Sequence, residues 1–202
     1  MTLPSGDRIV SVLRTLSVLG PNGHVEVEMS RAGAVVREDG LDWVVTELPT
    51  SAQERAGVVI LIVDLDHDGR GPGIGVAVPM TGACWRLDHE DEAKDLLRVL
   101  ARTGAVDAMA AVLAMFQSGG AAQRALDGTP DLLVAIGVPE HSRPPVHAPC
   151  FTAGPDESGW RLEFWSVATP HLRANRYTLH NWTVTCEGDD VAWWAAPEWT
   201  TP

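Results

Sequence analysis

The residues with the clearest chemical spacing are three aspartates at alternate positions, Asp64, Asp66 and Asp68, with Gly69 directly after them. Carboxylates at positions 1, 3 and 5 with glycine at position 6 match the opening of an EF-hand calcium loop. The match ends there, because Gly75 occupies the twelfth position, where a calcium loop has a bidentate glutamate. The pattern favours an Asp- and Gly-rich turn between strands, and a divalent-metal site at the three aspartates is kept as an alternative.

A second group of reactive side chains lies in a proline-rich segment, residues 139–158, which contains His147 and Cys150. These two residues could supply half of a tetrahedral zinc site. The histidines that could complete such a site are His141, His171 and His180. The Cys150 thiol could also act as a nucleophile activated by a histidine distant in sequence. Because only one close pair of ligands is present, packing in the loop and the core is the favoured interpretation, and a small-molecule pocket near His147, Cys150 and His180 is an alternative.

Several chemistries are disfavoured by the scarcity of lysine, since Lys94 is the only one in the sequence. Walker-type phosphate loops, Schiff-base enzymes and protein kinases each require a lysine in a defined place. Glycines at alternate positions from 69 to 75 could cradle a phosphate, but no helix and no lysine follows them. The acidic run at 88–92 precedes a predicted helix, where the helix N-terminus stabilises negative charge. We therefore expect no nucleotide-binding loop.

Tryptophan is concentrated near the C-terminus. Five of the eight tryptophans are Trp165, Trp182, Trp193, Trp194 and Trp199. Adjacent residues of a strand point to opposite faces, so the pair at 193 and 194 cannot both enter the same core. Tryptophan is usually a core residue, but it is also enriched at binding hot spots. The candidate binding residues are Trp182, Trp193, Trp194 and Trp199.

The net charge of −12 limits the partners that the chain can bind. An acidic surface repels phosphate, and no cluster of basic residues offsets it, so we expect no nucleic-acid or membrane binding and a basic surface on any protein partner. The longest apolar stretch, 105–116, is too short to span a bilayer. Three widely spaced cysteines and an N-terminus without a signal peptide favour reduced thiols in the cytoplasm.

The elements that must position these residues follow from hydrophobic periodicity. Helices are predicted at 9–19, 93–100 and 105–116. Strands are predicted at 25–29, 34–37, 41–45, 58–63, 74–78, 83–87, 132–138, 160–164, 180–186 and 191–194. Asp39-Gly40 predicts a tight turn between two strands, and 49–57 a polar loop.

Strand runs before and after a helical pair predict an α+β fold, with antiparallel sheets from the N- and C-terminal runs and the central helices packed on them. We expect one domain, 1–202, with a possible subdivision near 139–158. The absence of a complete catalytic motif, together with the charge, favours a soluble acidic binding protein of an accessory, regulatory or immunity type. A small-molecule enzyme or ligand-binding domain is the alternative, and a metal-binding protein the second alternative.

Overall fold

The computed structural model describes residues 3–31, 33–65, 73–117, 123–129, 133–134, 140–153, 159–168, 178–187, 190–195 and 199–200. The helices are α1 (Gly6–Thr15), α2 (Ala52–Ala56), α3 (Glu90–Thr103), α4 (Val106–Gln117) and the 3-10 turn η1 (Glu140–Ser142). The strands are β1 (Glu26–Met29), β2 (Gly33–Glu38), β3 (Leu41–Leu48), β4 (Val58–Leu65), β5 (Ile74–Pro79), β6 (Trp85–Arg86), β7 (Gln123–Ala125), β8 (Cys150–Ala153), β9 (Gly159–Ala168), β10 (Thr178–Glu187), β11 (Asp190–Ala195) and β12 (Trp199–Thr200).

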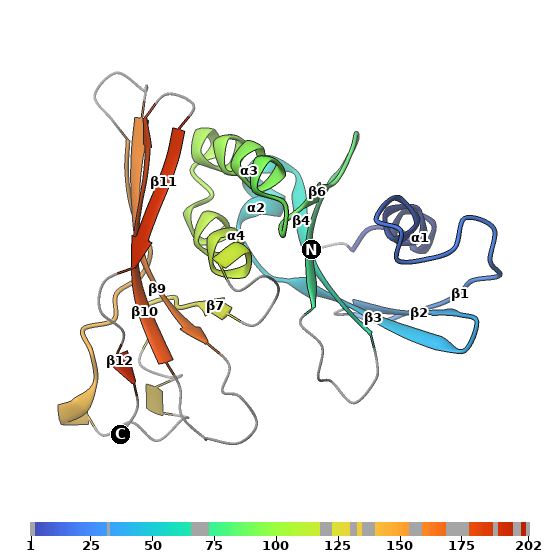
Figure 1. Ribbon diagram of the computed structural model, residues 1–202, viewed down its shortest axis with the longest axis horizontal. Helices are drawn as coiled ribbons and strands as arrows, with labels where there is room; N and C mark the ends of the chain where they lie inside the picture. The colour runs from blue at the N-terminus through green and yellow to red at the C-terminus, as the bar shows by residue number, and fades with distance from the viewer. Residues whose placement is uncertain are drawn as a thin grey trace.

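The elements stack in four layers (Figure 1): α1, a first sheet, the helices α2, α3 and α4, and a second sheet. The first sheet is an antiparallel meander in the order β1-β2-β3-β4-β5-β6. Its central strand β4 is apolar on both sides, because Val59 and Leu61 pack toward α1 while Val58 and Ile60 pack toward α3 and α4. Burial on both faces explains why the apolar run at 58–63 is continuous.

The second sheet has the order β11-β10-β9-β7, with β8 also paired to β9 and β12 to β10. Its helix-facing side buries Leu162 and Phe164 from β9, and Trp182 and Val184 from β10. These side chains join the same core cluster as α3, α4 and the inner residues of the first sheet. The predicted α+β fold, with antiparallel sheets and a central helical pair, is confirmed.

Local signals placed several elements correctly. Ser5 caps α1, and its side chain accepts a hydrogen bond from the Arg8 N–H. Asp39 and Gly40 have φ of 52° and 80°, which is the backbone that a two-residue hairpin turn requires. Gly104 ends α3 in the left-handed conformation, with φ of 68°.

Other predictions were wrong in detail. The predicted polar loop at 49–57 contains the helix α2, and its first turn is fixed by α4, because Ser51 N donates to Asp107 Oδ2 at 2.8 Å and the Ser51 hydroxyl donates to the same carboxylate. This contact spans 56 positions, so no local pattern reveals it. Of the predicted strand at 132–138, only 133–134 are described, and they are helical.

A core truncation tests whether both sheets unfold together. Phe164 is fully buried between the second sheet and the helices, so Phe164→Ala should lower the free energy of unfolding by about 3–5 kcal/mol. Hydrogen exchange should show the same decrease in the free energy of unfolding at the amides of β4 and of β9. The half-buried Phe151 provides the control, because Phe151→Ala should cost less. A loss confined to β9 would contradict the single-domain prediction.

Candidate functional site

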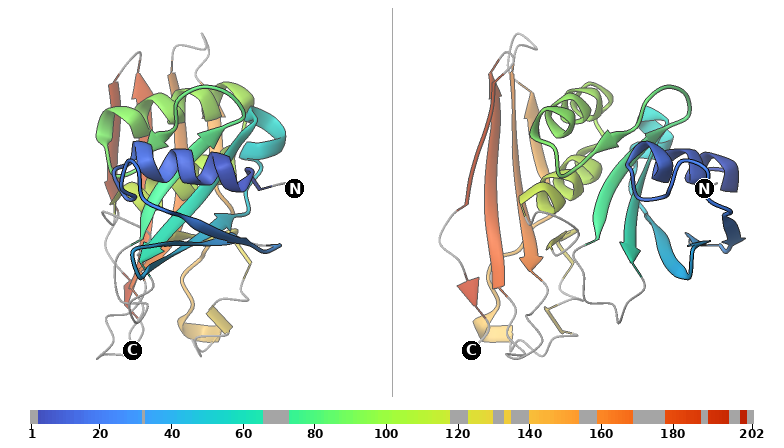
Figure 2. Two further views of the ribbon diagram at one scale, coloured as in Figure 1. Left: turned by 90° about the vertical axis from the view of Figure 1, so that its right-hand side faces the viewer. Right: turned by 45° about the vertical axis from the view of Figure 1, so that its right-hand side comes forward.

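The strand β11 forms one edge of the second sheet. It pairs with β10 from Glu187↔Asp190 at the hairpin end to Trp182↔Ala195, and no described strand pairs with its other side. Figure 2 shows it at the margin of the sheet, away from α1 and the first sheet. Since alternate residues of an antiparallel strand direct their backbone groups to opposite sides, every second N–H and C=O of β11 points away from β10.

The register assigns the adjacent tryptophans to different faces. Trp193 lies opposite Val184, which is buried against the helices, and Trp194 lies opposite Thr183, which is half-buried on the other face. Directly opposite residues share a face of the sheet, so position 193 belongs to the helix side and position 194 to the outer side. Trp199 lies opposite Leu179 at the far end of β10. The sequence expectation that the pair would divide between two faces agrees with this register.

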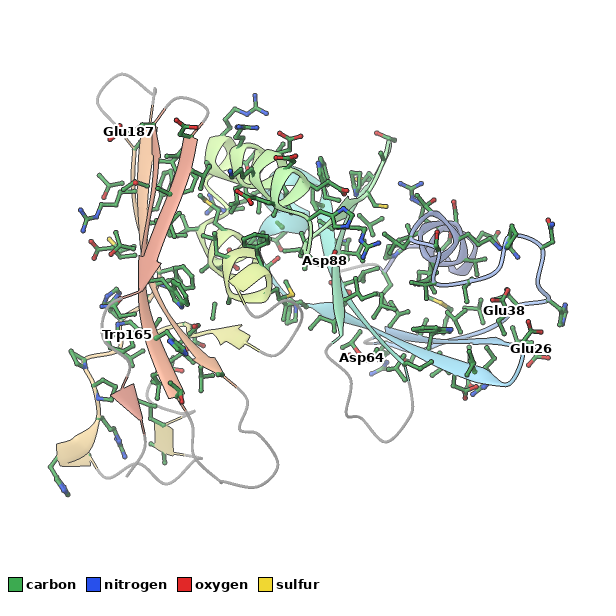
Figure 3. The ribbon with its side chains drawn as sticks, in the orientation of Figure 1. Glu26, Glu38, Asp64, Asp88, Trp165 and Glu187 are labelled. Atoms are coloured by element: carbon green, nitrogen blue, oxygen red, sulfur yellow. The ribbon has the colours of Figure 1, made fainter. Side chains whose placement is uncertain are left out.

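Acidic residues gather where β11 begins. Glu187 and Asp190 are exposed at the end of the β10–β11 hairpin, where Figure 3 labels Glu187. The single lysine, Lys94 of α3, binds Glu90 at 2.7 Å. The hydrogen bond to Glu90, with further attraction from Asp91 and Asp190, raises the pKa of Lys94. The start of this edge therefore lies in a negative field in which the lysine is already paired.

The opposite end of the fold carries a different kind of edge. The strand β1 lies at one edge of the first sheet. It exposes Glu26 and Glu28, the residues before and after Val27 in the sequence. Charged side chains on an edge strand discourage other chains from pairing with it. The strand β11 has no charged residue after Asp190, so it lacks this protection.

Trp182, predicted as a binding residue, is a core residue. Its side chain is 8% exposed, its ring stacks on Phe164 at a centroid distance of 6.5 Å, and its indole N–H donates to Ser166 Oγ at 2.8 Å. Ser166 is fully buried and lies opposite His180 across the strands. Because the hydroxyl is buried and accepts from the indole, this serine and histidine do not form an accessible nucleophile and base. Sequence reasoning missed Ser166, a polar residue in an otherwise apolar row of β9.

The histidine and cysteine candidates do not converge. Cys150 is exposed and lies opposite Glu163 on β9, whereas the half-buried His180 lies opposite Ser166, three residues further along and on the other face. This register places positions 150 and 180 on opposite faces of the second sheet. His147 is half-buried, with Nδ1 2.8 Å from the Ala148 carbonyl oxygen, which orients the ring locally.

The remaining histidines give little support to a zinc site. His141 is exposed in η1, and His171 lies outside the described residues. Within the described ranges, no group of three or more histidine, cysteine, aspartate or glutamate side chains is placed to hold a metal ion.

Of the three alternate aspartates, Asp64 is described, and Asp66 and Asp68 lie outside the described residues. Asp64, labelled in Figure 3, is near the end of β4 and lies opposite Val44 in the register. Its carboxylate lies against Gly73, where an added Cβ would be 2.1 Å from Oδ1. Burial raises the pKa of Asp64. Any larger residue at 73 would force the Asp64 side chain to move.

An open groove of about 570 Å³ lies between α1 and β1. Its polar walls include Asp7, Arg14 and His24, and its apolar lining is Val10, Val25 and Val27. None of the residues predicted from the sequence lines it.

Comparisons with protein families, with curated proteins and with solved structures find no match to this chain. No helix in the described part of the chain is long and apolar enough to cross a membrane.

A substitution at Asp64 tests the effect of its burial. Because the pKa is raised above the ordinary 3.8, the folded state binds the proton more tightly than the unfolded state, and stability falls as pH rises through this range. Asp64→Asn removes this loss of stability. The difference in the free energy of unfolding between the variant and the native chain, measured by urea unfolding, should therefore favour the variant more at neutral pH than below pH 3.8. A variant that is less stable at neutral pH would show instead that a partner, such as a cation, stabilises the carboxylate.

Proposed function

We propose that this chain is a non-catalytic binding protein, of an accessory, regulatory or immunity type, that holds a protein partner at the β11 edge of its second sheet. The observation that carries the proposal is the edge itself: a strand whose outer side no other described strand covers, and in which two adjacent tryptophans follow the acidic residues Glu187 and Asp190. Tryptophan contributes strongly to binding energy where it lies at the centre of an interface.

The position of Trp194 supports this proposal most directly. The opposite residue on β10, Thr183, is half-buried on the face away from the helices, and the next strand contributes Glu163 to the same row. Position 194 therefore combines an edge location with a face that the helices do not cover. Position 193 lies in the row of Val184, on the helix side of the sheet.

The enzyme alternative has less support. The exposed thiol of Cys150 and the imidazole of His180 lie on opposite faces of the second sheet. All three cysteines are free thiols, which supports a reducing compartment such as the cytoplasm as the place of action.

A pair of tryptophan substitutions tests the proposal. Immobilised native chain and Trp194→Ser should be compared as bait in extracts of the source cells, with retained proteins quantified by mass spectrometry. Loss of a hot-spot tryptophan typically costs about 2 kcal/mol or more, a roughly thirtyfold weaker affinity, so the specific partner should disappear from the Trp194→Ser sample. Trp193→Ser should instead lower the melting temperature.

The matched control is Trp43→Ser. Trp43 lies on β3, on the α1 side of the first sheet and away from β11. Once circular dichroism has shown that the control is folded, it should retain the same proteins as the native chain. Equal retention by the folded Trp194→Ser variant would refute a partner site at β11.

A further inference from the structure

We infer that the partner is held by strand addition: an extended segment pairs with β11 as a new edge strand, and this segment alternates apolar residues with lysine or arginine. This inference rests on the proposed function, and it specifies how the edge binds and which chemistry it selects.

The backbone of β11 supplies the first argument. The strand has six residues, and among the described strands only β10 pairs with it, on one of its two sides. The outward N–H and C=O groups can be satisfied by water or by another strand, and main-chain pairing is how sheet edges capture extended peptides. No proline interrupts the strand, so its outward side is a continuous template.

The side chains next to the edge determine the pattern of the added segment. Val191 is 9% exposed and belongs to the core on the helix side, so a residue added beside that row must be apolar. On the outer face the acidic residues nearest the edge are Asp190, on β11 itself, and Glu187, opposite it on β10, and both favour cationic side chains. Since successive residues of a strand alternate between faces, an added segment that alternates apolar and basic residues places the apolar ones on the helix side, beside Val191, and a basic one on the outer side, beside Asp190.

Charge also favours a basic segment over a second copy of this chain. A second copy carries the same net charge of −12 and brings the same acidic hairpin end. At the start of the edge, the Lys94 ammonium is bound to Glu90 and lies in the field of Asp91 and Asp190. Like-charge approach lowers association, whereas an approaching cationic segment is attracted.

The experiment measures amide exchange by nuclear magnetic resonance in the full-length, ¹⁵N-labelled chain. The probe is a peptide of about eight residues that alternates valine and lysine, the length of an ordinary strand. One control peptide alternates valine and glutamate. A second control alternates proline and lysine, which keeps the positive charge but removes every second N–H and cannot pair as a regular strand.

With the valine–lysine peptide, the fast-exchanging alternate amides of β11 should slow by about tenfold or more, and those of β1 should not change. The valine–glutamate and proline–lysine peptides should leave β11 unchanged. A Glu187→Gln, Asp190→Asn double variant should bind the valine–lysine peptide several-fold more weakly at low salt. The control Glu26→Gln, Asp39→Asn removes the same charge at exposed sites of the first sheet and should bind normally.

Three results would overturn the inference. Unchanged β11 amides with the valine–lysine peptide would exclude strand addition, and equal slowing by the proline–lysine peptide would show attraction by charge without strand pairing. Amides of β11 that are already slow in the peptide-free chain, with a dimer mass that rises with concentration, would identify a second copy as the occupant. If β11 amides stay unchanged while Trp194→Ser still loses its captured partner, the proposed function stands and strand addition fails.

Discussion

The whole architecture depends on a helix that has no face for water. From Ala108 to Met115, no residue of α4 is more than 8% exposed. A helix that is apolar all round must be covered on every side. One sheet covers only one side, so the helix pair needs a second sheet opposite the first, and three of the four layers of Figure 1 follow from this requirement.

This constraint also decides which surfaces remain available. The first sheet is covered on one face by α1 and on the other by α2, α3 and α4. The inner face of the second sheet packs against the same helices. Part of its outer face is covered as well, because Trp165 packs in a small cluster with Leu126, Leu133 and Val146. In the described part of the second sheet, the other part of the outer face and the adjoining edge at β11 are not covered by the helices, and this is where the acidic hairpin end and position 194 lie.

The sequence predicted what depends on local periodicity and could not predict what depends on strand order. The burial of 105–116, the alternation in 180–186 and the Asp39-Gly40 turn all follow from patterns within a few residues. The helix α2 depends on a carboxylate from α4, and the separation of Cys150 from His180 depends on the register of β9 with both its neighbours. The edge position of β11 is likewise a property of the sheet: the tryptophans were visible in the sequence, but the unpaired backbone beside them was not.

An unprotected edge strand is ordinarily a hazard, and the charge of this chain explains how it can be tolerated. At the edge strand β1 of the first sheet, the exposed Glu26 and Glu28 discourage pairing with another chain. At β11 the acidic residues lie at the hairpin end, where Asp190 is the first residue of the strand, and on the neighbouring α3, so the strand from Val191 onward carries no charge. For the strand addition proposed above, such an arrangement opposes the approach of other copies of the same acidic chain and attracts a cationic segment. In that proposal the charges that oppose self-association are also the charges that select a basic partner, so both effects have one physical origin.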